Sequence, residues 1–196
     1  RSRAALPNYQ YGLFARDSWL AVLVGQGILP QGYDRLAERF PVLAERRTPI
    51  LPGDTSETLH VRLSELGGAL LRDELPRFLA GALTPRPQPA EEVTVARMVE
   101  KEDGRLDWSR PAVELERRLR AFVPWPGGWT QLGGHLLKVW RAEVVEGSGV
   151  PGTVLAAHGV LDVACGTGAL RLLELQPEGK RRMSAAEFLS GHRLSE

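Results

Sequence analysis

Glycine and proline interrupt this chain so often that a bundle of long helices is a poor description of it. The 196 residues include 21 glycines and 14 prolines, and most of these stand between short apolar runs. Glycine supplies the backbone freedom that tight turns need, and proline cannot continue a helix or a central strand. The pattern therefore predicts many short elements joined by turns.

A proline-rich segment divides the chain in two. Residues 84–95, Thr-Pro-Arg-Pro-Gln-Pro-Ala-Glu-Glu-Val-Thr-Val, carry three prolines at alternate positions. Such a segment favours an extended, semi-rigid backbone. We therefore expect one domain over residues 1–83, a linker over 84–95 and a second domain over 96–196.

The first domain is expected to contain a long apolar helical stripe. Leu59, Leu63, Leu66 and Leu70 recur at helical spacing, after an Asp54–Glu57 pair that is typical of an N-cap and its N3 partner. Gly67–Gly68 is expected to break or kink this helix, with a second helical stretch ending near Gly81. For residues 19–24 the apolar run fits a buried strand or a short helix, and periodicity does not decide between them.

The second domain reads as a helix followed by short strands. Ser109 is expected to cap a helix whose buried face is Ala112, Leu115, Leu119 and Phe122, and which the prolines at 124 and 126 end. The expected strands are 129–132, 135–145, 152–156, 160–165 and 169–175, with a hairpin turn at 133–134. Five short strands at close spacing suggest a small closed barrel. A capping box at 184–187 opens a last helix that ends at 191.

Composition excludes several classes of protein. With 25 basic and 24 acidic residues the net charge is +1, so the chain is not a polycation that coats nucleic acid, although a local basic patch remains open. Cys165 is the single cysteine, which excludes a disulfide framework and fits a cytoplasmic protein. No apolar run reaches membrane-spanning length and no signal peptide opens the sequence. We expect no metal site, because none of the four histidines has a second histidine or a cysteine at ligand spacing.

One glycine motif points to a different function. Residues 160–168, Val-Leu-Asp-Val-Ala-Cys-Gly-Thr-Gly, resemble the first motif of S-adenosylmethionine-dependent methyltransferases. Only 28 residues follow Gly168, too few for the further βα units of that fold. We therefore expect a β-hairpin with its turn at 166–168 instead.

A second resemblance extends over most of the chain, from Arg47 to Leu194. Several segments in the right order resemble the second half of methionyl-tRNA formyltransferase. They are Arg47–Ile50 with Asp54–Ser56, Lys101–Trp108, Arg120–Phe122 with Pro124–Gly127, and Leu175–Lys180 with Met183–Ala185.

The resemblance implies both a fold and a function. It implies an α/β remnant of a Rossmann-like formyltransferase domain, followed by a small OB-like antiparallel β-barrel domain. The implied reaction is transfer of a formyl group from 10-formyltetrahydrofolate to the methionyl amino group of initiator tRNA in translation initiation. The implied protein is a monomer that uses no metal and has no membrane partner.

The resemblance also places the catalytic positions, and here the chain departs from the family. Leu6 and Pro7 resemble the end of the family's folate loop, and by spacing Glu38 occupies the place of the catalytic Asp. Ser2 stands where the family has a catalytic His, and the catalytic Asn would precede Arg1. Serine cannot replace an imidazole in proton transfer near neutral pH. We therefore expect a fragment, or a chain with an altered or gapped front part, that has little or no activity alone.

Arginine and lysine side chains are the candidates for holding tRNA, with a solvated charged surface as the alternative. Trp125 and Trp129 could stack on a base, but core packing is the favoured interpretation. Two other functions stay open: a non-catalytic RNA-binding OB-like module, and a related amino-sugar formyltransferase or formyl-folate hydrolase. The candidate tRNA-binding residues are Arg97, Lys101, Arg105, Arg117, Arg118, Arg120, Lys180, Arg181 and Arg182.

Overall fold

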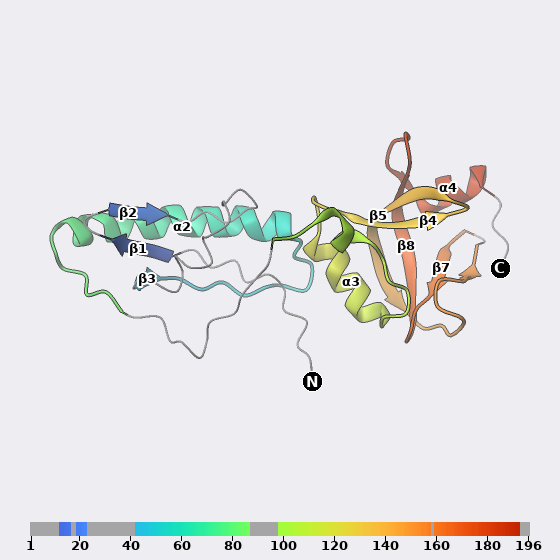
Figure 1. Cartoon of the computed structure of the whole chain (residues 1–196), viewed down its shortest axis with the longest axis horizontal. Coiled ribbons are helices and arrows are strands. Elements are labelled where there is room, and N and C mark those ends of the chain that lie inside the picture. The colour runs from blue at the N-terminus through green and yellow to red at the C-terminus, as the bar shows by residue number, and fades with distance from the viewer. Residues whose placement is uncertain (1–11, 17–18, 23–41, 87–97, 158, 193–196) are drawn as a thin grey trace. The chain divides into compact units, whose positions relative to one another are not determined.

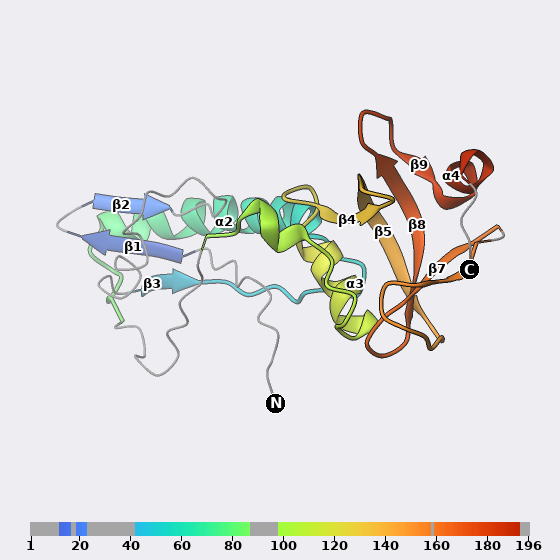
Figure 2. The ribbon, with the colours of Figure 1, turned by 45° about the vertical axis from the view of Figure 1, so that its right-hand side comes forward.

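The structure is a computed structural model that describes residues 12–16, 19–22, 42–86, 98–157 and 159–192 (Figures 1 and 2). The chain divides into two compact units, one made of Pro7–Val99 and one that contains Glu100–Glu196. We refer to the described residues before Glu100 as the N-terminal unit and to Glu100–Glu196 as the C-terminal unit. No helix within the described ranges has the length and apolar character to cross a membrane.

The N-terminal unit contains a small antiparallel sheet. Strands β1 (Gly12–Arg16), β2 (Trp19–Val22) and β3 (Val42–Glu45) lie in the order β2-β1-β3. The apolar run at 19–24, which fits a strand or a helix by sequence, is therefore a strand over its described part. A Rossmann-like domain is built on parallel strands. The described residues therefore do not confirm the expected Rossmann-like remnant.

Helix α2 (Ser56–Leu79) is a single continuous helix. Leu59, Leu63 and Leu70 are buried and Leu66 is half-buried, which confirms the apolar stripe. The expected break at Gly67–Gly68 is wrong. Two helical glycines cost about 2 kcal/mol relative to alanine, whereas each buried leucine contributes about 1.5–3 kcal/mol, so burial outweighs the low helix propensity.

The start of α2 lies one residue beyond the predicted N-cap. Thr55 is the N-cap and forms a reciprocal capping box with Thr58. Asp54 instead accepts a hydrogen bond from the Leu51 N–H at 2.7 Å and pairs with Arg62. The Arg62 guanidinium, followed by the Leu51 N–H, lowers the pKa of Asp54 to about 2. The aspartate also accepts the Thr58 hydroxyl at 3.2 Å, so it ties the loop before α2 to the first turns of the helix.

The C-terminal unit opens with a short 3-10 helix, η2 (Lys101–Gly104), and helix α3 (Ala112–Ala121). Pro111 occupies the N-cap position of α3, so the prediction that Ser109 caps it is wrong. Ser109 donates its hydroxyl and its N–H to Asp107 instead. The predicted end of the helix is correct, because its C-cap is Phe122, two residues before the first of the two prolines.

Six strands follow and build one antiparallel sheet. Their order is β4-β5-β8-β7-β6, with β9 paired to β8 beyond this path. The predicted hairpin at Gly133–Gly134 is confirmed, because both glycines have positive φ and β4 pairs directly with β5. The bounds are β4 Gly128–Leu132, β5 His135–Val145, β6 Val154–Ala156, β7 Leu161–Ala164, β8 Ala169–Pro177 and β9 Met183–Ser184.

The sheet is curled but its two ends are not joined among the described residues. β5 and β8 are the long central strands, and their register shifts on both sides of Arg141. Such bulges bend a strand and increase its twist (Figure 2). The chain thus forms a half-barrel with β4 and β6 as its edges, rather than the closed barrel that the strand count suggests.

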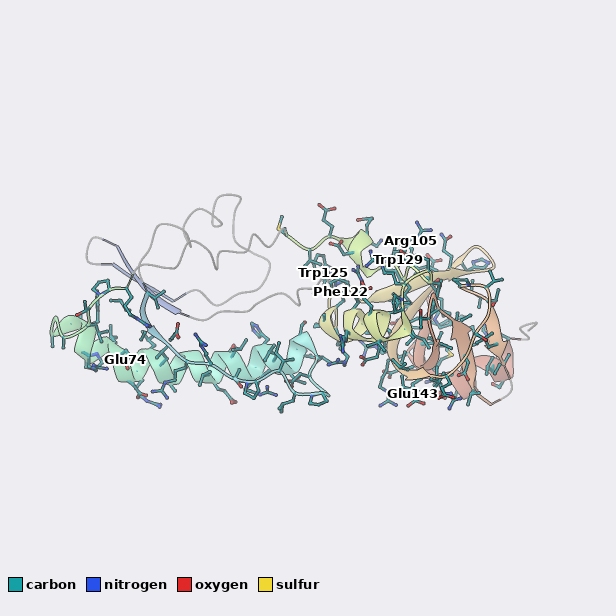
Figure 3. The ribbon with its side chains drawn as sticks, turned by 90° about the horizontal axis from the view of Figure 1, so that it is seen from below. Glu74, Arg105, Phe122, Trp125, Trp129 and Glu143 are labelled. Carbon is teal, nitrogen blue, oxygen red and sulfur yellow. The ribbon has the colours of Figure 1, made fainter. Side chains whose placement is uncertain are left out.

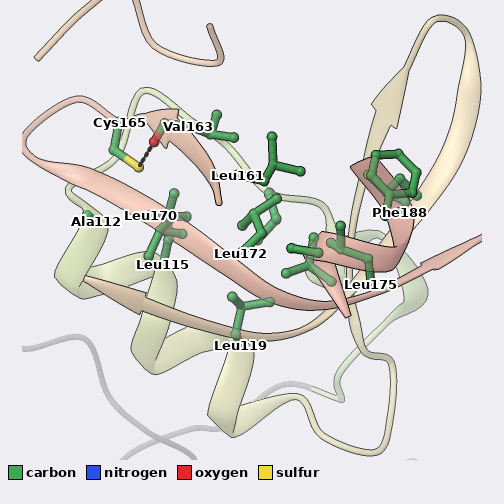
Figure 4. Packing of buried hydrophobic residues seen from close by; sticks show 14 residues of the cluster. Ala112, Leu115, Leu119, Leu161, Val163, Cys165, Leu170, Leu172, Leu175 and Phe188 are labelled. Carbon is green, nitrogen blue, oxygen red and sulfur yellow. Dashed lines mark hydrogen bonds between the residues drawn. The ribbon is translucent and has the colours of Figure 1, made fainter. Parts of the chain in front are cut away.

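The core of the C-terminal unit lies between α3 and the curled sheet (Figure 4). Leu115 and Leu119 from α3 pack with Val139, Leu170 and Leu175 from the sheet. Phe188 of α4 (Ala185–Gly191) joins the same cluster. The predicted capping box at the start of α4 is confirmed, since Ser184 and Glu187 exchange their hydrogen bonds.

Candidate functional site

The hairpin between β8 and β9 carries the basic run Lys180–Arg182. Gly179 turns it with a φ of +70°, and the Lys180 N–H donates to the Pro177 carbonyl at 3.0 Å. All three basic side chains are exposed. The predicted basic run therefore lies on a hydrogen-bonded turn that directly follows the central strand β8.

Trp140 of β5 lies against this hairpin. The guanidinium carbon of Arg182 stands 3.3 Å from the centroid of the Trp140 ring, and the Lys138 ammonium nitrogen stands 5.5 Å from it. The indole N–H of Trp140 donates to Gln176 Oε1 at 2.9 Å. Two cations from separate segments of the chain thus lie near the same aromatic ring, at cation–π distance.

Arg181 has a different environment from its neighbours. Its guanidinium pairs with Glu187 at 2.8 Å, next to the capping box of α4. The Ser184 N–H, followed by Arg181, lowers the pKa of Glu187 to about 2. Arg181 is therefore a cation that the protein already neutralises.

The lowered pKa of Glu187 predicts how stability depends on pH. Because the folded pKa lies below the ordinary value of 4.5, the carboxylate stabilises the fold fully above that pH, and the contribution disappears as pH falls towards 2. We expect the free energy of unfolding of Glu187→Gln, measured by urea titration, to depend less on pH between about 4.5 and 2 than that of the unchanged protein. Glu178→Gln, at an exposed hairpin position, is the control. If the free energy of unfolding fell equally with acid pH in Glu187→Gln and in the unchanged protein, the prediction would be contradicted.

The three arginines of α3 are not equivalent. Arg117 is exposed. Arg118 donates to the Asp103 carbonyl at 2.9 Å and lies over the Phe122 ring, and Arg120 pairs with Glu116 at 2.6 Å. Two of the three are thus partly buried and already engaged, which leaves Arg117 as the exposed cation of this helix.

Two further candidates lie on the segment before α3. Arg105 is exposed, with its guanidinium carbon 6.0 Å from the Trp129 ring centroid, and the Lys101 carbonyl accepts the Trp129 indole N–H at 3.1 Å. Figure 3 draws Arg105 and Trp129 together, with Trp125 near the end of α3. Trp129 is half-buried, but Trp125 is 58% exposed, so core packing does not describe Trp125.

The candidate catalytic and folate-binding positions lie outside the described residues. These are Glu38, Leu6 and Pro7, together with Ser2 at the place of the family histidine. The candidate Arg97 also lies outside them. They stay predictions of the sequence.

The methyltransferase-like motif is a hairpin turn, as expected. β7 pairs with β8 up to Ala164–Ala169, and Gly168 has a φ of +73°. Asp162 of this motif is held by the cross-strand partner Arg171 through two hydrogen bonds of 2.8 and 2.9 Å. Cys165 is buried, and that burial raises the pKa of its thiol. Strand pairing and core burial thus account for both side chains.

The described ranges contain no group of three or more His, Cys, Asp or Glu side chains that could hold an ion. His192 stacks on Phe188 with ring centroids 4.2 Å apart, and His135 is an exposed residue at the start of β5. His158 lies outside the described residues.

Sequence reasoning missed Lys138, Trp140 and Gln176. The alternation of β5, with Leu137 and Val139 buried, was the available signal, because it places Lys138 on the opposite face. The contact of Trp140 with the β8–β9 hairpin could not be found this way. It depends on a strand register that periodicity does not determine.

The comparisons with known proteins agree with this architecture. Residues 98–193 match the model of the formyl transferase C-terminal domain. Methionyl-tRNA formyltransferase from Myxococcus xanthus is 58% identical over 156 residues, covering 79% of this chain and 50% of the relative. The enzyme of the same name from Paracoccus denitrificans is 46% identical over 194 residues, covering 99% of this chain and 61% of the relative.

A solved structure gives the same result at the level of the fold. HypX from Aquifex aeolicus, in complex with tetrahydrofolic acid, matches 76% of this chain and 27% of its own with a TM-score of 0.56. Its sequence identity is 22%, so the likeness concerns the fold alone. The chain spans about half the length of the curated relatives it matches. Residues 98–193 therefore match a formyl transferase C-terminal domain, and the chain is similar to methionyl-tRNA formyltransferases over most of its length.

Proposed function

We propose that this chain is the tRNA-holding half of a methionyl-tRNA formyltransferase. The complete reaction moves a formyl group from 10-formyltetrahydrofolate to the methionyl amino group of initiator tRNA, in translation initiation. The observation that carries the proposal is the 58% identity to the Myxococcus xanthus enzyme of that name. The exposed cations of the C-terminal unit support it, because they suit an RNA backbone.

We propose that the two units have different functions, catalysis in one and tRNA binding in the other. The N-terminal unit would be the end of a Rossmann-like catalytic domain that binds the folate, with Leu6, Pro7 and Glu38 at its site. The C-terminal unit, an OB-like half-barrel, would hold the tRNA. We propose a monomer that acts in the cytoplasm without a metal or a membrane partner.

Formyl transfer to an amine passes through a tetrahedral intermediate with a developing oxyanion. Hydrogen-bond donors that face this oxygen lower the barrier, and a basic group must accept the proton of the attacking amine. Serine at position 2 supplies no imidazole for either role, and Glu38 would carry its carboxylate about one C–C bond further out than aspartate. We therefore propose that this chain alone binds tRNA but turns over weakly or not at all.

The tRNA contacts would be mainly electrostatic. Double-helical RNA is recognised through shape, 2′-hydroxyl groups and phosphates rather than through base edges in its deep groove. Exposed cations on separate segments of one unit could follow a phosphate backbone in this way. The proposed contacts are Lys101, Arg105, Arg117, Lys180 and Arg182, with Arg97, Arg118, Arg120 and Arg181 as further candidates.

A single assay tests this proposal. Formyl transfer to initiator methionyl-tRNA is measured with saturating 10-formyltetrahydrofolate, and tRNA binding is measured in the same samples. Binding without turnover is the expected result. Turnover would show that residues 1–46 hold a working site, and the absence of binding would contradict the proposal and favour an amino-sugar or formyl-folate relative.

A further inference from the structure

We infer that Trp140 is a positioning residue, which holds the guanidinium of Arg182 and the ammonium group of Lys138 as a clamp for a phosphate of the RNA backbone. This inference rests on the proposed tRNA binding and adds the arrangement that performs it. We call Lys138, Trp140 and Arg182, with Gln176 between them, the Trp140 cluster.

The register of the sheet brings this cluster together. Lys138 pairs directly with Gln176, whereas Val139 pairs with Leu175 and Arg141 with Glu174. Trp140 is therefore the extra residue of a β-bulge, a feature that redirects a side chain locally. On the other side of β8, Met183 pairs with Leu175, so Arg182 comes next to Gln176. Lys138 of β5, Gln176 of β8 and Arg182 just before β9 thus lie next to Trp140.

Gln176 fixes both the ring and the hairpin. Its Oε1 accepts the indole N–H of Trp140 at 2.9 Å, and its Nε2 donates to the Lys180 carbonyl at 2.9 Å. The ring is thereby oriented by the same side chain that ties down the basic turn. A preorganised site of this kind loses less conformational entropy on binding than flexible arginines would.

The stacking leaves the polar edge of Arg182 available. A guanidinium lying on an aromatic ring uses its face, whereas its five N–H groups point outward in its plane and match a phosphate in a bidentate manner. Within the described residues, the side chains of Lys138, Lys180 and Arg182 form no hydrogen bond or ion pair. Arg181, by contrast, is neutralised by Glu187. The cluster therefore concentrates positive charge that the protein itself leaves uncompensated.

A double-mutant cycle tests this inference with an initiator tRNA transcript as the probe. We expect Trp140→Leu and Arg182→Ala each to weaken binding about tenfold, the effect of losing one charge-assisted contact. Because both changes remove the same contact, the double variant should bind about as weakly as either single one. Losses that multiply, to about a hundredfold, would show that Trp140 does not act through Arg182 and would overturn the inference.

Conservative variants separate positioning from general structure. Trp140→Phe keeps an aromatic face and should retain most of the affinity, while Arg182→Lys keeps the charge but loses the planar fork and should resemble Arg182→Ala. If Trp140→Leu fails to fold, as judged by thermal unfolding, these two variants decide the question. Full affinity in Arg182→Lys would overturn the inference.

The experiment also separates failure of the inference from failure of the proposed function. If the unchanged protein binds no tRNA, both are wrong. If the unchanged protein binds tRNA and none of the variants changes the affinity, only the inference is wrong.

Discussion

Changing Lys180, Arg181 and Arg182 together to alanine is expected to weaken initiator tRNA binding about a hundredfold at moderate salt. Two of these cations, Lys180 and Arg182, have no carboxylate partner among the described residues, and each charge-assisted contact contributes about 1.5 kcal/mol or more. The slope of log affinity against log salt should also fall by about two, because fewer counterions are released. Titrations at several salt concentrations measure both quantities.

The matched control removes the same charge elsewhere. Arg46, Arg72 and Arg77 of the N-terminal unit each lie within ion-pair distance of a carboxylate, namely Asp73 for the first two and Glu74 for the third. Changing these three to alanine should leave the affinity and the salt slope almost unchanged. Equal losses in the two triple variants would mean that net charge, and not the hairpin, determines binding.

Replacing Gly166 by alanine is expected to destabilise the C-terminal unit by about 2–4 kcal/mol. The hairpin turn lies against the chain before α3, and the Gly166 N–H donates to the Arg110 carbonyl at 3.0 Å. A Cβ at this position would collide with the Ser109 carbonyl oxygen, which is backbone and cannot move aside cheaply. Overpacking of this kind costs about 1–3 kcal/mol, and the loss of the hydrogen bond adds to it. Urea unfolding measures the change.

This prediction also distinguishes the two interpretations of the glycine motif. If Gly166 served a cofactor, its replacement would change ligand binding and leave the stability intact. Gly191→Ala is the control, because a Cβ there meets nothing within 4 Å. A Gly166→Ala variant as stable as Gly191→Ala would contradict the packing described for this turn.

Local signals predicted much of the C-terminal unit. The bounds of β5 coincide with the predicted strand, and the turn at Gly133–Gly134 and the capping box at Ser184 are confirmed. These features depend on residues close together in the sequence, such as paired glycines or a serine three residues before a glutamate. Where stability is decided within a few residues, composition and spacing are sufficient.

Features that depend on distant partners were missed. The continuity of α2 through Gly67–Gly68 follows from burial of its leucine face, which propensity does not include. The bulge at Trp140 follows from the pairing of β5 with β8, so the side chain that organises the basic hairpin could not be found by motif. The exposure of Trp125 was also missed, because tryptophan side chains are on average highly buried and the local sequence does not show which of them lacks covering residues.

The most direct test of the central claim, that the hairpin face of the C-terminal unit holds initiator tRNA, uses its lysines. The whole chain has three, Lys101, Lys138 and Lys180, and all lie in this unit. Their acylation rates can be followed by mass spectrometry with and without bound initiator tRNA. We predict that Lys138 and Lys180 become strongly protected, while the rate at Lys101 reports whether the contact extends to η2. Saturating tRNA that leaves Lys138 and Lys180 as reactive as in the free protein would contradict the account.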